Sequence, residues 1–239
     1  MSKFYDEIAL VYDDIFPFKK NKLDFILKCL VKSNSNILDV ACGSGVYASE
    51  LAKLGHQVTA IDLDAEMIKQ TNKRNSNLTS QVMNMLDISN LANQFDLIYS
   101  LGNSIVHLDS LQEIEAFFRQ AYLKLKDNGK LLIQIINYDR ILDHNIKSLA
   151  TINNKEANLS FVRNYTYLKE EGKIAFNTIL KHNGKEIENT VKLLAIRQAE
   201  LISILKNVGF SNIKFFGDFA GNEFDCNQSI PCIFLASKD

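Results

Sequence analysis

The sequence predicts an α/β protein built on a doubly wound, mostly parallel sheet with an antiparallel β insertion. Three observations support this prediction. Short apolar runs alternate with helical patterns up to residue 136, and the alternation resumes after residue 196. Between the two regions, closely spaced β-type runs are joined by turn sequences such as Asn183-Gly184. Alternation indicates parallel strands joined by helical crossovers, whereas an Asn-Gly turn is typical of a β-hairpin.

Hydrophobic spacing defines the expected elements of the alternating regions. Between Tyr5 and Lys32 the spacing is helical and Pro17 interrupts it, so two helices are expected there. Asp127-Asn128-Gly129 is expected to close a later helix. The further expected helices lie at 45–54, 65–75, 114–125 and 201–208. The expected strands lie at 37–41, 58–61, 81–85, 95–100, 130–136, 212–216 and 232–236.

The stretch 139–196 is predicted to form the antiparallel insertion. Turns are expected at Glu170-Glu171-Gly172 and Asn183-Gly184. The expected strands around these turns lie at 159–167, 173–180 and 190–196. The chain therefore divides into a main domain, 1–138 and 197–239, and an insertion that serves the substrate side or a contact between subunits.

Composition and charge exclude several classes of function. The 239 residues carry a net charge of −1 and lysines alternate with acids, so no basic surface for nucleic acid is expected. No apolar run approaches the roughly 20 residues of a membrane span, and the start lacks the apolar core of a signal peptide. The cysteines and histidines are dispersed, which predicts reduced thiols in a cytoplasmic protein and no metal site.

A glycine loop follows the first expected strand. Gly43 and Gly45 let the backbone turn tightly and approach a ligand, and the next helix presents unpaired N–H groups. Asp62 ends the second strand, at about the twenty-residue spacing at which an acid accepts both hydroxyls of a ribose. Together the loop and the acid predict a cofactor that contains adenosine. The alternative is a glycine turn beside a surface aspartate.

Asp39 distinguishes between two adenosine cofactors. The sequence from Gly43 to Ala48 also fits the loose G-x-G-x-x-A pattern of a nicotinamide dinucleotide site. An acid near the end of the first strand would oppose the two phosphates of a dinucleotide. It would favour a methionyl group that carries an ammonium and a sulfonium. Asp39 could instead bond the loop amides, which is compatible with the sulfonium cofactor.

At these residues the chain resembles class I S-adenosylmethionine-dependent methyltransferases. Asp39-Val40-Ala41-Cys42-Gly43-Ser44-Gly45 is similar to their first motif, and Ile61-Asp62-Leu63-Asp64-Ala65-Glu66-Met67 to their ribose-binding motif. The resemblance implies a Rossmann-like sheet of seven strands and S-adenosyl-L-methionine as the cofactor, with Leu63 and Met67 beside the adenine. The cofactor-binding residues that it implies in these motifs are Asp39, Ala41, Gly43, Gly45, Asp62, Leu63 and Met67.

Later segments resemble the glycine N-methyltransferases more closely. These segments are 101–108, 137–142, 217–219 and 230–232, together with Asn84-Met85, which matches the pair that holds the adenine edge. The resemblance implies that the carbonyl of Leu101 or Gly102 faces the methyl donor and the acceptor amine. The substrate-binding residues that it implies are Tyr12, Asn103, Ser104 and Tyr138, with Tyr12 closing the pocket from the N-terminal helix.

Two positions bear on the acceptor. Ile136 stands where the glycine enzymes have an arginine that pairs with the substrate carboxylate, so glycine is not expected as substrate unless Arg140 takes over that role. His107 is expected either to take a proton near neutral pH or to position its loop. Gly102, Asn103 and His107 are the candidate catalytic residues.

The sequence thus predicts a methyltransferase that acts on a small molecule, with an amine nitrogen as the expected acceptor. Methylation of oxygen or carbon is a variant on the same fold. An NAD(P)-dependent oxidoreductase and a binding protein without activity are the alternatives from other classes. The group that holds the cofactor carboxylate stays open among Lys19, Lys20 and Lys22, and assembly into a homo-oligomer stays open as well.

Overall fold

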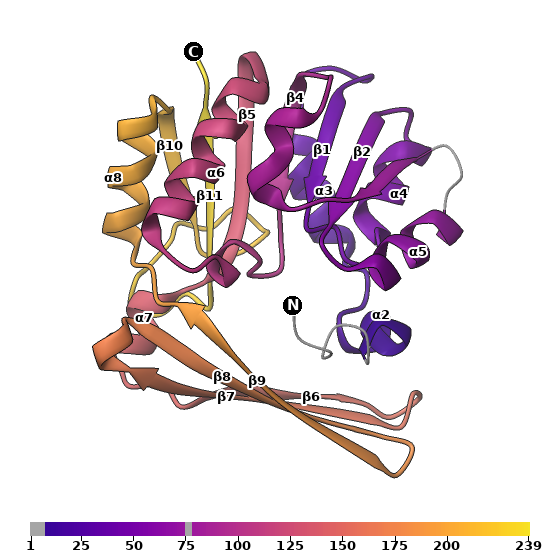
Figure 1. The fold of residues 1–239 in the computed structure, drawn as a ribbon, viewed down its shortest axis with the longest axis vertical. Coiled ribbons are helices and arrows are strands. Elements are labelled where there is room, and N and C mark those ends of the chain that lie inside the picture. The colour runs from indigo at the N-terminus through magenta and orange to yellow at the C-terminus, as the bar shows by residue number, and fades with distance from the viewer. Residues whose placement is uncertain (1–7, 75–77) are drawn as a thin grey trace.

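The computed structural model describes residues 8–74 and 78–239; Tyr5 and Asn75, expected in helices, lie outside these ranges. Seven strands form one sheet in the order β10-β11-β5-β4-β1-β2-β3 (Figure 1). Their bounds are β1 (Asn36–Val40), β2 (Gln57–Asp62), β3 (Thr79–Val82), β4 (Phe95–Ser100), β5 (Leu125–Ile136), β10 (Ser211–Phe216) and β11 (Pro231–Ser237). Neighbours among β1 to β5 are parallel, and β11 is antiparallel to β5 and β10. The predicted α/β sheet is confirmed.

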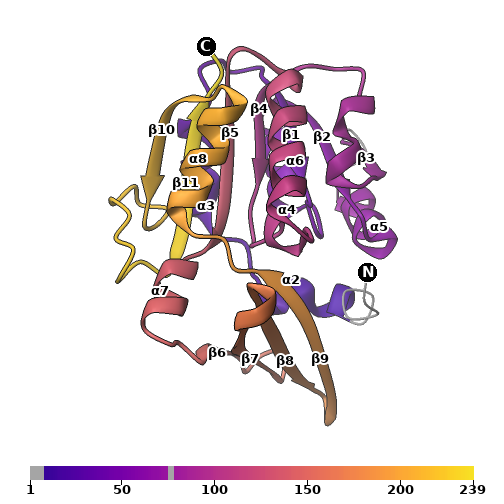
Figure 2. The same ribbon diagram turned by 60° about the vertical axis from the view of Figure 1, so that its left-hand side comes forward.

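Helices cover both faces of this sheet, and Figure 2 shows two of them, α6 and α8, side by side on one face. The helical segments are η1 (Ala9–Val11), α2 (Tyr12–Ile15), α3 (Lys20–Lys28), α4 (Val46–Lys53), α5 (Ala65–Arg74), η2 (Met85–Asn90), η3 (Ile105–His107), α6 (Leu111–Lys124), α7 (Tyr138–Asp143), η4 (Lys169–Glu171) and α8 (Gln198–Val208). Leu38 and Val40 pack with α6 and α8, whereas Ile37 packs with α3 and α4. Alternate residues of β1 therefore serve two cores.

A second sheet of four antiparallel strands lies within the predicted insertion. Its order is β6-β7-β8-β9, with bounds β6 (Ser148–Asn154), β7 (Leu159–Leu168), β8 (Lys173–His182) and β9 (Lys185–Leu194). Asn183-Gly184 forms the predicted two-residue hairpin, since His182 pairs with Lys185. Figure 1 shows this sheet beyond the carboxyl ends of the parallel strands, with α2 between the two sheets.

Two predicted elements of the seven-stranded domain differ from the structure. The strand predicted at 81–85 is β3, which ends at Val82 because this residue pairs with Asp62 at the end of β2. Asp127-Asn128-Gly129 does not close a helix, because β5 begins at Leu125 and pairs there with Phe95. The turn forms an irregularity inside β5, where Asn128 has a φ of 62°.

The insertion was predicted with one strand too few. β6 is an edge strand that pairs with β7, and its polar sequence carries no alternating apolar signal. β9 starts five residues before the strand predicted at 190–196, because the hairpin turn fixes its pairing with β8. The interruption at Pro17 was predicted correctly, since α2 and α3 lie on either side of it. Among the described residues, no helix has the length and apolar character needed to cross a membrane.

Candidate active site

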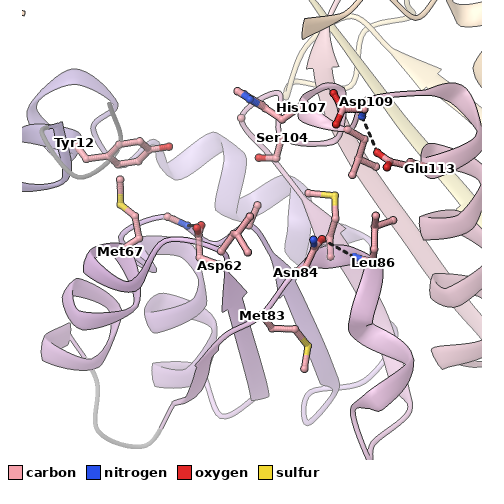
Figure 3. A pocket seen from close by; sticks show the side chains of 16 residues that line it. Tyr12, Asp62, Met67, Met83, Asn84, Leu86, Ser104, His107, Asp109 and Glu113 are labelled. Atoms are coloured by element: carbon pink, nitrogen blue, oxygen red, sulfur yellow. Dashed lines mark hydrogen bonds between the residues drawn. The ribbon is translucent and has the colours of Figure 1, made fainter. Parts of the chain in front are cut away.

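A cavity of about 250 Å³ opens at the carboxyl ends of β1, β2 and β4. Ligands of open α/β sheets bind at this edge. Sixteen residues line the cavity, and Figure 3 shows their side chains. Those expected from the sequence are Tyr12, Ala41, Gly43, Asp62, Leu63, Met67, Asn84, Met85, Gly102, Ser104 and His107.

The loop after β1 is built around two glycines in the left-handed conformation. Gly45 has a φ of 72° and precedes α4, and a Cβ at this position would lie 2.5 Å from the side chain of Thr71. Gly43 has a φ of 56°, and a Cβ there would lie 3.3 Å from the ring of Tyr12. The loop therefore passes between α5 and an aromatic ring in a space that glycine alone fits without strain.

Backbone amides hold the Asp62 carboxylate at the cavity. Its Oδ2 accepts from the Gly43 N–H at 2.8 Å, and its Oδ1 accepts from the Asp64 N–H at 2.9 Å. Burial raises the pKa of Asp62, and these amide bonds act in the opposite direction. Each carboxylate oxygen can accept more than one hydrogen bond, so both keep a lone pair for a further donor. The group therefore presents two fixed acceptors, which suit the paired hydroxyls of a ribose.

Apolar side chains continue the cavity next to Asp62. Leu63, Met67 and Met85 line this part, and Leu63 is 43% exposed. Asn84 begins η2, where its Oδ1 accepts from the Leu86 N–H at 3.0 Å and its amide N–H groups stay available as donors. A slot with apolar walls and an amide at its edge fits the flat ring and the ring nitrogens of an adenine.

Asp39 lies beneath the glycine loop and outside the cavity lining. Its side chain is 4% exposed, and the hydroxyl of Tyr99 donates to its Oδ2 at 2.6 Å. Burial raises the pKa of Asp39 to about 7; the bond from Tyr99 lowers it and the negative charge of Asp62 raises it further. Within the described residues Asp39 bonds Tyr99 and not a loop amide. Its action on a bound cation stays a prediction.

The loop after β4 is fastened to β5. The N–H groups of Gly102 and Asn103 donate to Oε1 and to the main-chain oxygen of Gln134, at 2.9 Å and 3.1 Å. The Asn103 side chain accepts from the Ile136 N–H at 2.9 Å and donates to the Tyr138 hydroxyl at 3.1 Å. Asn103 and Tyr138 thus brace the loop from outside the cavity lining, and their contact with a substrate stays a prediction.

Ser104 and His107 line the cavity beyond this loop, and Tyr12 lies across the cavity from them (Figure 3). Burial lowers the pKa of His107 to about 4. The imidazole is therefore neutral at physiological pH, and it is a weak proton acceptor there. Of the two roles expected for His107, the structure favours the positioning role.

Ionic contacts fix α2, and with it Tyr12, to the glycine loop. The Ser44 hydroxyl donates to Asp13 at 2.6 Å, and Arg74 Nε donates to the Ser44 main-chain oxygen at 2.7 Å. Arg74 also pairs with Asp13. This network joins α2, the loop and α5, so the N-terminal segment and the cofactor loop form one wall of the cavity.

Several predicted residues lie outside the cavity lining. These residues are Asp39, Gly45, Leu101, Asn103, Tyr138 and Arg140. The three candidate lysines also lie outside it. Lys20 pairs with Asp24 on the surface at 3.0 Å. Lys22 lies 5.2 Å from the ring centre of Phe219, and burial lowers its pKa to about 8. The group that holds the cofactor carboxylate therefore stays open.

Five lining residues were not predicted: Met83, Leu86, Leu108, Asp109 and Glu113. The sequence carries a signal for Glu113, because Ser110 and Glu113 have the Ser-x-x-Glu spacing typical of a helix start. The Ser110 side chain accepts from the Glu113 N–H at 3.2 Å, and the Glu113 carboxylate accepts from the Asp109 N–H at 2.7 Å. Met83 directly follows β3 and was missed because that strand was placed too late.

The lining suits S-adenosylmethionine, although parts of the predicted set lie outside it. Asp62 offers acceptors for a ribose, and the slot beside Leu63 offers apolar walls for an adenine. The charged lining residues are all acids, Asp62, Asp109 and Glu113, which suits a ligand with positive charge. Across residues 8–74 and 78–239, no three His, Cys, Asp or Glu side chains are grouped to hold a metal ion.

Comparison with known proteins gives consistent matches. Residues 37–129 match the family model described as a methyltransferase domain. A glycine/sarcosine N-methyltransferase of Aphanothece halophytica is 26% identical over 203 residues, covering 82% of this chain and 74% of that protein. A ubiquinone biosynthesis O-methyltransferase of Xanthomonas oryzae pv. oryzae is 29% identical over 117 residues, covering 48% of this chain and 49% of that protein.

The fold is also found among solved structures. An S-adenosylmethionine-dependent methyltransferase from Clostridium acetobutylicum superposes with a TM-score of 0.80 at 17% identity, covering 98% of both chains. The matches confirm the resemblance to glycine N-methyltransferases and favour the sulfonium cofactor over a nicotinamide dinucleotide. From its glycine loop, the acid at the end of β2 and these relatives, the chain is a class I S-adenosylmethionine-dependent methyltransferase.

Proposed function

We propose that this methyltransferase acts on an amine nitrogen of a small molecule in the cytoplasm. The observation that carries the proposal is that the His107 imidazole beside the loop after β4 is a weak base, and that the nearby Asp109 carboxylate pairs with Lys173. Tyr12, Ser104 and His107 line that part, and His107 has a pKa of about 4. A neutral amine attacks with its lone pair and needs no base before the transfer, whereas an alcohol must lose its proton as it attacks.

The protein's own residues would align and shield the acceptor. When bound, S-adenosylmethionine supplies a methyl group that its sulfonium already activates. The main-chain carbonyl of Gly102 and the Ser104 hydroxyl can accept the hydrogens of an amine, and the Tyr12 ring covers the glycine loop. Alignment of this kind contributes about 7–11 kcal/mol to lowering a barrier.

A small acceptor fits the site better than a polymer. The cavity has a volume of about 250 Å³. The insertion sheet lies beyond the carboxyl ends of the parallel strands (Figure 1), the edge at which the cavity opens, which supports the prediction that residues 139–196 serve the substrate side. A net charge of −1 gives little attraction for a nucleic acid. Methylation of oxygen is the second candidate, because the relative from Xanthomonas is an O-methyltransferase by name.

Matched acceptors test the proposal. The protein is incubated with S-adenosylmethionine that carries a ¹³C-methyl group and with amines and alcohols of equal size, such as alanine against lactate and glycine against glycolate. Carbon NMR separates N-methyl from O-methyl products. The proposal predicts products from amines alone. Turnover of the alcohols without turnover of the amines would contradict it, and the Asp62→Asn variant supplies the background rate.

A further inference from the structure

Three buried polar atoms on the insertion sheet have no hydrogen-bond partner within residues 8–74 and 78–239: Arg163 Nε, Tyr165 Oη and Asn189 Nδ2. Buried polar groups in folded proteins are usually paired, so such atoms call for an explanation. All three atoms carry a hydrogen that can be donated. Three unpaired donors on one small sheet indicate a site for a ligand with acceptor atoms.

Strand register places these donors on one face of the sheet. Arg163 pairs with Thr178 across β7 and β8, and Thr178 pairs with Asn189 across β8 and β9. Directly paired residues project to the same face, and Tyr165 shares that face because it lies two residues after Arg163. Adjacent strands are about 4.8 Å apart, so the donors are close neighbours. We call Arg163, Tyr165, Thr178 and Asn189 the polar patch.

The polar patch faces the main domain, because apolar neighbours on both sides of it pack there. On one side Phe161 and Leu180 share a core with Ile15 of α2. On the other side Tyr165 and Leu193 share a core with Ile105 of η3, and β9 contacts η3.

The two elements that flank the patch also border the cavity. α2 carries Tyr12 and η3 carries His107, and Figure 3 shows these two side chains across the cavity from one another. Lys173 of β8 pairs with the lining residue Asp109 at 3.1 Å, so the insertion sheet reaches the edge of the cavity. The patch therefore lies between the part of the sheet that packs on α2 and the part that packs on η3, next to the cavity lining and not within it.

The charge of the polar patch is positive and not balanced by an acid. Arg163 Nη2 donates to the Ala150 main-chain oxygen at 2.6 Å. None of the ion pairs between described residues includes Arg163. The Arg163 side chain is half-buried, and this burial lowers the pKa of its guanidinium. A partly buried cation with neighbouring N–H and O–H donors favours an anionic ligand.

We propose that the polar patch binds the carboxylate of the methyl acceptor, so that the substrate is an amino acid or a related molecule with an amine and a carboxylate. This inference rests on the proposed function, which supplies the amine. Arg163 would provide on the insertion the charge that Ile136 cannot provide at the end of β5. The amine would then reach the loop after β4 while the carboxylate stays at the sheet.

Binding of small anions tests the site without turnover. Calorimetry on the complex with S-adenosylhomocysteine measures the affinity for acetate, for its uncharged counterpart acetamide and for inorganic phosphate, at constant ionic strength. We expect acetate to bind more tightly than both. Arg163→Gln should weaken acetate by about tenfold or more. Arg119→Gln is the matched control, since Arg119 is an exposed residue of α6 that pairs with Glu115.

A second variant separates binding from folding. Tyr165→Phe keeps the ring that stacks on Phe176 at 5.3 Å and removes only the unpaired hydroxyl. We expect weaker acetate binding with an unchanged or higher melting temperature. Wild-type acetate affinity in both Arg163→Gln and Tyr165→Phe would overturn the proposal, as would a preference for phosphate or a loss seen only in Arg140→Gln.

Turnover then distinguishes the two proposals. With an amino acid that is methylated, Arg163→Gln should raise KM for it while leaving KM for the corresponding amide unchanged. Acetate binding that depends on Arg163, together with no methylation of any amine, supports the carboxylate site and contradicts N-methylation. If amines are methylated but Arg163→Gln changes neither acetate affinity nor KM, N-methylation is supported and the carboxylate site is contradicted.

Discussion

The cofactor half of the cavity and its acceptor half are built in different ways. The cofactor half consists of the loop after β1 and the residues that directly follow β2 and β3, so neighbours in sequence are neighbours in space. The other half, where the acceptor is proposed to bind, combines α2 with the loop around η3, about 90 residues apart, and the insertion sheet packs beside these elements without lining the cavity. Local chemistry specifies the first half, and long-range packing specifies the second. Changes in the two halves should therefore have different effects.

The largest effect is expected at the glycine loop. Gly45→Val places a side chain on a backbone with a φ of 72° and 2.5 Å from Thr71. We expect the free energy of unfolding to fall by about 2–5 kcal/mol, from the left-handed conformation and from overpacking together. Urea denaturation measures this loss.

Gly55→Ala is the matched control, because Gly55 has a φ of 92° and no atom within 4 Å of an added Cβ. It should lose about 1–2 kcal/mol, from the backbone conformation alone. If both variants lost the same free energy of unfolding, close packing against Thr71 would not constrain the loop.

A smaller effect is expected where the two halves meet, at Asn103. Asn103→Ala leaves the Ile136 N–H and the Tyr138 hydroxyl without their partner, which should cost about 1–3 kcal/mol of stability. Turnover should fall, while affinity for S-adenosylhomocysteine stays within about threefold, because Asn103 lies outside the cavity lining. Asn103→Gly is the control for backbone strain. It removes the same two hydrogen bonds, but glycine adopts a φ of 74° without the strain that alanine would have there. A large loss of cofactor affinity with full stability would mean that Asn103 contacts the ligand.

The smallest effect concerns Asp39 and depends on pH. Burial raises its pKa from 3.8 in the unfolded chain to about 7 in the fold, so the folded state binds the proton more tightly. The stability that Asp39 contributes is therefore complete below about pH 3.8 and is lost as pH rises through 7. Relative to wild type, Asp39→Asn should gain about 1 kcal/mol between pH 6 and pH 8. Scanning calorimetry at both pH values measures this change. The same stability difference between Asp39→Asn and wild type at pH 6 and pH 8 would contradict the prediction.

The sequence predicted most of the fold because short apolar strand segments alternate with amphipathic helical segments along the chain. The elements whose bounds were predicted wrongly are those whose ends depend on hydrogen-bond pairing with a neighbouring strand. β3 ends where β2 ends, and β6 exists because β7 offers it an edge. The turn at Asn128 lies inside β5 because Leu125 pairs with Phe95. No local signal in the sequence carries these pairings.

The same division holds for the site. Asp62 could be predicted because it ends a strand, and Leu63 and Asn84 could be predicted through the resemblance to known methyltransferases. Asp109 and the polar patch could not, since long-range packing positions the loop before α6 and the insertion sheet next to the cavity. Asn103 and Tyr138 were expected at the substrate, yet they bond each other outside the cavity lining.

Titration of S-adenosylhomocysteine into wild type and Asp62→Asn tests most directly that two fixed acceptors hold the cofactor ribose. The substitution keeps the shape of the side chain and removes its charge. We expect affinity to fall by about 10- to 100-fold. Asp87→Asn, on an exposed residue of η2, should leave it unchanged. Equal affinity of Asp62→Asn and wild type would contradict the account, because the cofactor would then be held without the carboxylate at the end of β2.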